Sequence, residues 1–194
     1  RRVLPVGFVR QSYETCAPAT LAAVSTYLQK PAEHVEIAKE ICYGGTPDFL
    51  ERRWAIKQGF TVHEFQVTWE STVGLINLGI PFTLTTVFLT AGHLQAVIGY
   101  DERAGTIVIR DPNTRHESQV LAEEFFDQEK SNGPRGMVLV PPHLVEQVAA
   151  LNLKDVALYD HLNGIRQALD AHDRPTAAEH LAKMIALDKE HRLT

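Results

Sequence analysis

The sequence predicts an α+β fold in which helices come first, an antiparallel sheet follows, and a small helical hairpin ends the chain. Three observations support this prediction. Apolar residues recur at helical spacing as far as Gly59, whereas alternating or β-branched runs dominate between Thr61 and Val140. After Pro142 that alternation stops, and alanine and leucine recur at helical spacing. Helix and strand patterns are therefore segregated along the chain, as in α+β proteins.

The length and composition limit the kinds of protein that this chain can be. Its 194 residues, 44% of them hydrophobic, can bury one good core with a small extra module. We therefore expect one domain over residues 1–141 and a helical tail over 142–194. The net charge of -5 is mild and no basic block occurs, which argues against nucleic-acid binding. No apolar run reaches the ~18 residues that a membrane-spanning helix needs.

The cysteines and histidines indicate neither a disulfide framework nor a metal site, and no cofactor is expected. Two cysteines are too few for such a framework, which favours a reducing compartment and predicts a cytoplasmic protein. His172, His180 and His191 lack a partner at i,i+4 spacing and a neighbouring cysteine, so we expect them on the solvated surface. Because the chain begins with Arg1 rather than Met, the lack of a signal peptide says little about location.

The first half of the chain is expected to form an extended arm, four helices and one strand. Thr15 can cap the first helix, and Pro18 is tolerated in its first turn because the missing N–H has no partner there. Thr46 is the expected N-cap of the third helix, which ends before Gly59. The expected elements are an arm over 1–10, helices over 16–30, 31–41, 46–58 and 69–78, and a strand over 61–67.

The second half of the domain is expected to supply most of the sheet. Two apolar strands, 94–100 and 106–109, are joined by the polar loop 101–105, which ends in a glycine. This pattern is typical of a β-hairpin. The other expected elements are a strand over 81–89, a helix over 120–126 and a closing strand over 136–140.

The tail is expected to form two helices, over 159–171 and 176–187, separated at Pro175. This pair resembles one tetratricopeptide-type helix hairpin, with Ala177, Leu181 and Ile185 on the inner face of its second helix. A single unit of that kind cannot bury its own apolar face well. Either the pair docks on the first domain or the natural protein continues. A protein partner or a homodimer could also use this tail.

Cys16 is the first candidate for chemistry. It precedes an alanine-rich run over 19–28, so it is expected at the N-terminus of a buried helix. Unpaired N–H groups and the helix dipole at that position stabilise a thiolate and lower the pKa of the thiol.

His93 and Asp111 are the second and third candidates. His93 enters the first strand of the expected hairpin, and Asp111 follows the second strand. In antiparallel pairing the start of one strand lies beside the end of the next, so the two side chains should be close together. His93 could then act as the base for Cys16, with Asp111 orienting its ring. The amide of Gln11, just before the cysteine, could join the Cys16 backbone N–H as an oxyanion donor.

Each of these residues also has a purely structural interpretation. Cys16 can be an ordinary cysteine in a helix start, and His93 can be a core histidine bonded to the backbone. Asp111 can cap a turn, and Gln11 can be a surface residue. Cys42 has no nearby histidine in the sequence and is expected to be buried and inert.

Three segments of the sequence resemble, in the same order, the motifs of a known family. They are Gln11 with Thr15-Cys16-Ala17-Pro18-Ala19, then Gly92-His93-Leu94-Gln95-Ala96-Val97-Ile98-Gly99-Tyr100-Asp101, then Ile109-Arg110-Asp111-Pro112. They are similar to the bacteriocin-processing peptidase family and its peptidase-like relatives, which are papain-like cysteine peptidases. The resemblance covers roughly residues 3–141. Two departures are that Ala17 stands where the family usually has Gly, and that Gln11 lies five residues before the cysteine rather than six.

This resemblance implies a papain-like fold and a peptidase acting on a peptide or protein. It implies Cys16 as nucleophile, His93 as base, Asp111 as orienter and Gln11 as oxyanion donor. The best-known members cut leader peptides after a double glycine beside a transporter domain. No transporter segment occurs in these 194 residues, so that specificity is not extended to them. Two other functions stay open: an acyl or peptidyl transferase, and a catalytically inactive peptide-binding module.

Overall fold

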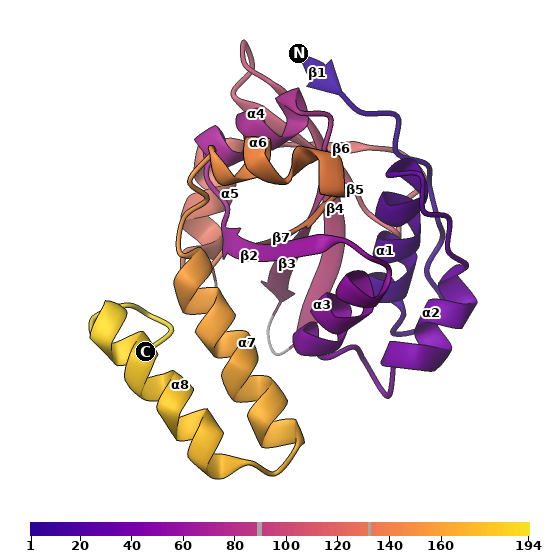
Figure 1. Cartoon of the computed structure of the whole chain (residues 1–194). Coiled ribbons are helices and arrows are strands. Elements are labelled where there is room, and N and C mark those ends of the chain that lie inside the picture. The colour runs from indigo at the N-terminus through magenta and orange to yellow at the C-terminus, as the bar shows by residue number, and fades with distance from the viewer. Residues whose placement is uncertain (89–90, 132) are drawn as a thin grey trace.

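The computed structural model describes residues 1–88, 91–131 and 133–194. Figure 1 shows an antiparallel sheet with helices packed around it and a helix pair at the C-terminus. Leu89, the last residue of the strand expected over 81–89, lies outside the described residues. None of the helices in the described ranges is both long and apolar enough to cross a membrane.

The strands of the described residues form one antiparallel sheet with the order β2-β7-β3-β4-β5-β6, and β1 pairs with β4. The expected α+β class with an antiparallel sheet is therefore confirmed, and a parallel doubly wound sheet is excluded. The strands are β1 (Arg2–Val3), β2 (Thr61–Gln66), β3 (Phe82–Phe88), β4 (Ala91–Asp101), β5 (Thr106–Arg110), β6 (Ser118–Leu121) and β7 (Arg135–Val140).

The helices lie in three groups around this sheet. In Figure 1, α1 to α3 lie together at the right, α4 to α6 gather at the upper left, and α7 and α8 form the antiparallel pair below. The helices are α1 (Cys16–Tyr27), α2 (His34–Ile41), α3 (Asp48–Lys57), α4 (Trp69–Asn77), α5 (Ala122–Glu129), α6 (Val145–Ala149), α7 (Val156–Asp170) and α8 (Arg174–Leu187), with a 3-10 turn over Pro142–Leu144.

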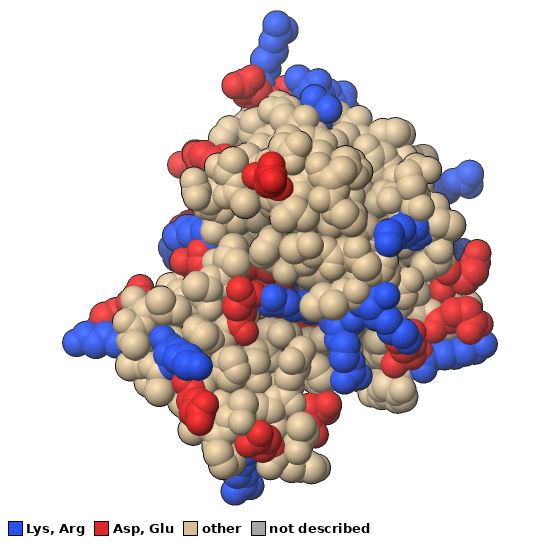
Figure 2. Space-filling view, viewed as in Figure 1, with Lys and Arg blue, Asp and Glu red and all other residues tan. Residues whose placement is uncertain are grey.

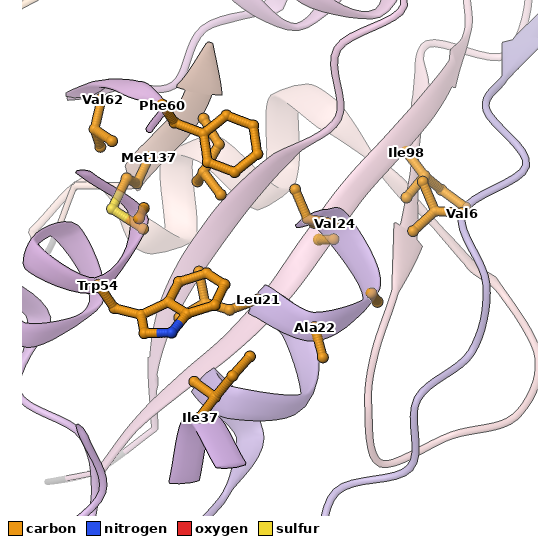
Figure 3. Packing of buried hydrophobic residues seen from close by; sticks show 14 of the residues in the cluster. Val6, Leu21, Ala22, Val24, Ile37, Trp54, Phe60, Val62, Ile98 and Met137 are labelled. Carbon is orange, nitrogen blue, oxygen red and sulfur yellow. The ribbon is translucent and has the colours of Figure 1, made fainter. Parts of the chain in front are cut away.

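Both faces of the sheet are buried. Successive side chains of a strand point to opposite faces, and along β7 Met137 belongs to one apolar cluster while Val138 belongs to the other. Figure 3 shows the first cluster, in which Leu21 of α1 and Trp54 of α3 lie near Met137. Burial of each such large side chain contributes roughly 1.5–3 kcal/mol. This packing holds α1 and α3 against the sheet.

Several element boundaries differ by a few residues from the sequence prediction, and two of them change the role of a named residue. The N-cap position of α3 is Pro47, not Thr46. Val120 belongs to β6 rather than to a helix, because its segment pairs with β5 before α5 begins at Ala122. The apolar residues at 120–126 serve a strand and then a helix, and helical spacing over so short a run does not separate the two.

The β4–β5 hairpin forms as expected. Asp101 pairs with Thr106, and Gly105 in the loop has a φ of 62°, a conformation that glycine adopts without strain. The carboxylate of Asp101 accepts a hydrogen bond from the backbone N–H of Arg103 at 3.1 Å. Because this turn fixes the strand register, it also fixes which residues meet at the opposite end of the hairpin.

The tail helices α7 and α8 pack on the rest of the molecule. α7 lies against β2 and α3. Arg52 of α3 pairs with Asp160 of α7 at 2.5 Å, and Asp48 pairs with Arg166. Figure 2 shows basic and acidic side chains gathered where the tail meets the body. The helix pair thus docks on the first domain, whereas its tetratricopeptide-like character and the division at residue 141 stay predictions.

The inner face of α8 differs from the expected one. Ala177 is buried as expected, but Leu181 and Ile185 are 41% and 47% exposed, and Met184 is buried instead. Pro175 lies in the first turn of α8 rather than in a break before it. Met184 precedes Ile185 by one residue, so the observed face is rotated by about 100° from the predicted one at this point of the helix.

Two of the tail histidines are not solvated as expected. His180 is half-buried, with its Nδ1 3.1 Å from Nδ1 of His161. His191 is half-buried and pairs with Asp155 at 3.2 Å. His172 is exposed. Helical spacing within one helix does not show a partner on another helix, which is why these contacts were missed.

Candidate active site

Cys16 is the first residue of α1, and it is half-buried. Backbone N–H groups in a first helical turn lack partners within the helix, and the helix dipole there favours negative charge. The turn before it is closed by the Thr15 hydroxyl, which accepts a hydrogen bond from Ser12 N–H at 2.8 Å and lies 3.0 Å from His34 Nε2. Thr15 therefore stands at the N-cap position but makes no capping hydrogen bond, contrary to the expectation.

His93 and Asp111 meet at one end of the β4–β5 hairpin. The pairing places Ala96 opposite Arg110, so the start of β4 lies beside the end of β5. His93 Nε2 lies 3.0 Å from Asp111 Oδ1. The same carboxylate oxygen accepts the backbone N–H of Asn113 at 2.7 Å, which holds it in place. A carboxylate can only accept a hydrogen bond, so Nε2 of His93 carries a proton. Nδ1 of His93 is then the ring nitrogen left for the Cys16 thiol.

One buried hydrogen bond links the helix of Cys16 to the strand of His93. The hydroxyl of Thr20, one turn after Cys16, donates to the carbonyl oxygen of Leu94 at 3.0 Å. Thr20 is 2% exposed, so this bond is shielded from water. The hydrogen bond from Thr20 to Leu94 was not predicted, although a hydroxyl four residues after the cysteine in an alanine-rich run was a visible signal.

Cys16 and His93 shift each other's pKa in opposite directions. Burial raises the pKa of the Cys16 thiol, but its hydrogen bonds with His93 and the Leu94 backbone lower it, and the pKa ends below the ordinary 9.0. The hydrogen bond with Cys16 raises the pKa of His93, burial lowers it, and Asp111 raises it, so it ends above 6.5. Both shifts favour a thiolate beside an imidazolium.

Gln11 is attached to the turn that holds Asp111. Its backbone N–H donates to the carbonyl oxygen of Pro112 at 3.0 Å. Its side-chain Oε1 is buried and has no hydrogen-bond partner among the described residues. Within the same residues, no hydrogen bond joins Gln11 to Cys16. The structure thus brings Cys16, His93 and Asp111 together and places Gln11 beside the third of them.

A cavity of about 680 Å³ opens beside Cys16. The helical half and the sheet both line it, so the candidate nucleophile lies in a cleft between them. The lining residues used below are Glu14, Asp48, Glu51, Thr85, Arg135 and Arg166. Arg166 comes from α7, so the tail contributes to the wall of this cleft.

A buried ionic cluster forms the inner end of the cavity. The guanidinium of Arg135 donates from Nε to Glu64 at 2.6 Å, and from Nη1 to Thr85 at 2.8 Å and to Glu51 at 3.2 Å. Glu51, Glu64 and Arg135 are 4%, 2% and 7% exposed. This cluster was not predicted from the sequence. Its one visible signal was Glu51, a charged residue one turn before Ala55 on the apolar face of its helix.

Glu51→Gln is expected to stabilise the protein more at about pH 8 than at about pH 5. Burial raises the pKa of Glu51 from 4.5 to about 7, although Arg135 partly opposes this. The stabilisation linked to such a raised pKa is complete below 4.5 and is lost as the pH rises through about 7. The loss amounts to roughly 3 kcal/mol. Glutamine stays neutral at every pH and avoids it.

Urea unfolding of both proteins across this pH range measures the effect. The free energy of unfolding of the variant minus that of the unmodified protein should rise from about pH 5 and level off near pH 8. A difference that does not change with pH would show that Glu51 does not titrate in this range.

Cys42 is half-buried rather than buried, and its thiol donates to the carbonyl oxygen of Glu14 at 3.3 Å. No histidine hydrogen-bonds to it among the described residues. No group of three or more metal-binding side chains occurs in the described part of the chain.

Comparison with known proteins gives one family. A family model described as the Peptidase_C39 like family matches residues 3–134. No curated protein matches the chain. The family match contains every candidate site residue and ends before α7.

Two solved structures show the same fold. The peptidase domain of Streptococcus ComA, a bi-functional ABC transporter involved in a quorum sensing pathway, has a TM-score of 0.56 and 18% identity, over 70% of this chain and 98% of that one. A double glycine motif protease from an AMS/PCAT transporter, in complex with its leader peptide, has a TM-score of 0.53 and 16% identity, over 73% and 99%. These likenesses show a papain-like α+β fold, as the sequence predicts.

Proposed function

The chain belongs to the Peptidase_C39 like family and contains a cysteine peptidase-like domain, and from this premise we propose that it is a thiol hydrolase that cleaves a peptide or amide bond. In this proposal Cys16 is the nucleophile, His93 the base and Asp111 the residue that orients the base. The observation that supports it best is the position of the His93 ring, whose Nε2 lies 3.0 Å from Asp111 Oδ1 and which is near enough to the Cys16 thiol for each group to shift the other's pKa.

The reaction would use this geometry in two steps. The Cys16 thiolate attacks the carbonyl carbon, a C–S bond forms, and the electron pair of the C=O bond moves to oxygen. The imidazolium of His93 then gives its proton to the leaving amine as the C–N bond breaks. Water, deprotonated by His93, attacks the thioester carbon, and the C–S bond breaks, which releases the acid and restores the Cys16 thiolate beside the His93 imidazolium. Asp111 holds the ring in the tautomer that leaves Nδ1 facing the sulfur.

The negative charge that develops on the carbonyl oxygen needs hydrogen-bond donors to stabilise it. The backbone N–H of Cys16 lies at the start of α1, where such groups have no partner within the helix. Gln11 is the second candidate donor by resemblance, and its attachment to Pro112 keeps it at the same end of the hairpin as His93. We assign it this role as part of the proposal.

A peptide is the proposed substrate. The double glycine motif protease is described in complex with a leader peptide, and its fold is that of this chain. The cavity of about 680 Å³ beside Cys16 has room for several residues of an extended chain. A partner or a second copy bound through the tail stays a prediction.

The alkylation rates of the two cysteines test the proposal. At about pH 6.5, Cys16 should react with iodoacetamide on the order of tenfold faster than Cys42, because His93 favours its thiolate. His93→Ala should remove that advantage, and Asp111→Asn should reduce it less, since the aspartate acts through the ring. Mass spectrometry of the modified peptides gives both rates in one sample.

Cys42 is the internal control, because it lies in the same chain and lacks a histidine partner among the described residues. Equal rates at the two cysteines would contradict the nucleophile assignment. Fast alkylation without turnover of any peptide would instead favour a binding module. Product analysis separates hydrolysis from transfer, because both pass through the same thioester.

A further inference from the structure

The charges around the inner end of the Cys16 cavity do not balance. Three arginines lie in or behind its wall and pair with four carboxylates, because Glu64 also lies 3.5 Å from Arg52 and Glu51 lies 3.2 Å from Arg135. Arg135 pairs with Glu64 at 2.6 Å, Arg52 pairs with Asp160 at 2.5 Å, and Arg166 pairs with Asp48.

Of these four carboxyls, Glu51 lies farthest from its nearest arginine. Its contact is the 3.2 Å bond from Arg135 Nη1, an arginine that already has the shorter bond to Glu64. No other hydrogen-bond partner of Glu51 is found among the described residues. The exposed Glu14 lines the same cavity and adds a fifth carboxylate. The cavity therefore has a surplus of negative charge when Glu51 is ionised.

A buried carboxyl in this situation suits a cationic ligand. Burial keeps the pKa of Glu51 at about 7, so its proton is easily displaced near neutral pH. A cation that enters the cavity would pair with the carboxylate out of bulk water, where a charged hydrogen bond contributes more than at the surface.

We propose that this cavity binds a basic side chain of the substrate, lysine or arginine, with the Glu51 carboxylate as its counter-ion. Cys16 lines the same cavity, so this lysine or arginine would lie next to the bond that is cleaved. That placement rests on the proposed function, in which Cys16 is the nucleophile. Glu51 is thus a residue that determines specificity, and it lines the same cavity as the thiol.

An acidic side chain is the competing ligand. Arg135 Nη2 is buried and has no partner among the described residues, so it could donate a hydrogen bond to a carboxylate. Such a ligand would be a third carboxylate around one guanidinium, beside Glu64 and Glu51. A basic ligand instead adds a positive charge where four carboxylates share three arginines, and the charge count therefore favours it.

Binding of a cation should release a proton. Below pH about 7 Glu51 is protonated in the free protein and must ionise to pair with the ligand. The ionisable groups that face Glu51 are Arg135 of β7, Glu64 of β2 and Cys16 of α1. The affinity for a basic ligand should therefore fall as the pH drops below about 7 and be nearly constant above it.

The test measures binding in the full chain with Cys16→Ala, which cannot turn the peptides over. Isothermal titration uses three acetylated and amidated tripeptides, Gly-Lys-Gly, Gly-norleucine-Gly and Gly-Glu-Gly. The lysine peptide should bind about tenfold more tightly than its norleucine counterpart, as expected for one buried charged hydrogen bond. Titration in two buffers of different ionisation enthalpy should show proton release at about pH 6.5.

Two further variants separate Glu51 from other causes. Adding Glu51→Gln should abolish both the lysine preference and the proton release. Adding Glu102→Gln makes the same chemical change at the exposed tip of the hairpin and should alter neither. Equal binding of the lysine and norleucine peptides, or tighter binding of the glutamate peptide, would overturn the inference. Because no turnover is measured, these outcomes are independent of whether the unmodified protein is a hydrolase.

Discussion

Cys16→Ala is expected to abolish turnover of any peptide substrate while leaving the protein folded. Loss of the nucleophile removes the thioester step, and in a comparable hydrolase such a loss lowers kcat by about 10⁶-fold. Alanine is a good helix former, so the start of α1 should persist. The measurement is kcat/KM on a peptide that the unmodified protein cleaves, together with the midpoint of urea unfolding.

Cys42→Ala is the matched control, because it removes the other thiol, which is also half-buried. It should keep activity within about twofold and change stability by less than about 1 kcal/mol. If Cys16→Ala kept full activity on a validated substrate, the assignment of the nucleophile would be wrong. If both variants lost activity together with their fold, the unfolding midpoints would reveal it.

The meeting of His93 and Asp111 could be predicted from the sequence because it depends on local structure. A polar loop with a terminal glycine predicts a hairpin, and antiparallel pairing then places the start of one strand beside the end of the next. The position of Cys16 at a helix start follows from the same kind of short-range pattern. The hairpin pattern therefore predicts that His93 and Asp111 meet, and the helix pattern predicts that Cys16 begins a helix. Neither pattern predicts the contact between Cys16 and His93, because it depends on how the helix packs against the sheet.

The ionic cluster could not be predicted, because its members are far apart in the chain. Arg135 bonds to Glu51 across 84 residues and to Glu64 across 71. Glu64 and Arg135 each have the pattern of an ordinary charged position, and only Glu51, on the apolar face of its helix, differs from that pattern. The docking of α7 is of the same kind, since only the fold brings Asp160 to Arg52.

The prediction of the inner face of α8 was wrong for a different reason. Leu181 and Ile185 have the spacing of a buried stripe, yet they are 41% and 47% exposed. The helix is apolar around much of its circumference, so periodicity alone does not select the side that packs. The observed side holds Met184 and His180, and it is the one that faces α7.

Arg135→Met is expected to destabilise the protein by roughly 3–5 kcal/mol near pH 8, the cost of breaking a buried ion pair by removing one partner. Methionine keeps much of the volume of the side chain, so the loss comes from charge and hydrogen bonds rather than from a cavity. Glu64 and Glu51 lose their common donor while they stay buried, and Thr85 loses its bond of 2.8 Å. Urea unfolding at about pH 8 measures the change.

Two comparisons make this expectation specific. Arg103→Met changes an exposed arginine in the hairpin loop and should cost less than about 0.5 kcal/mol. Adding Glu64→Gln to Arg135→Met removes one stranded carboxylate and should restore part of the loss. The cost of Arg135→Met should also shrink as the pH is lowered, because protonated carboxyls need no counter-ion. A loss that neither the second substitution nor low pH relieves would mean that Arg135 stabilises the fold by packing alone.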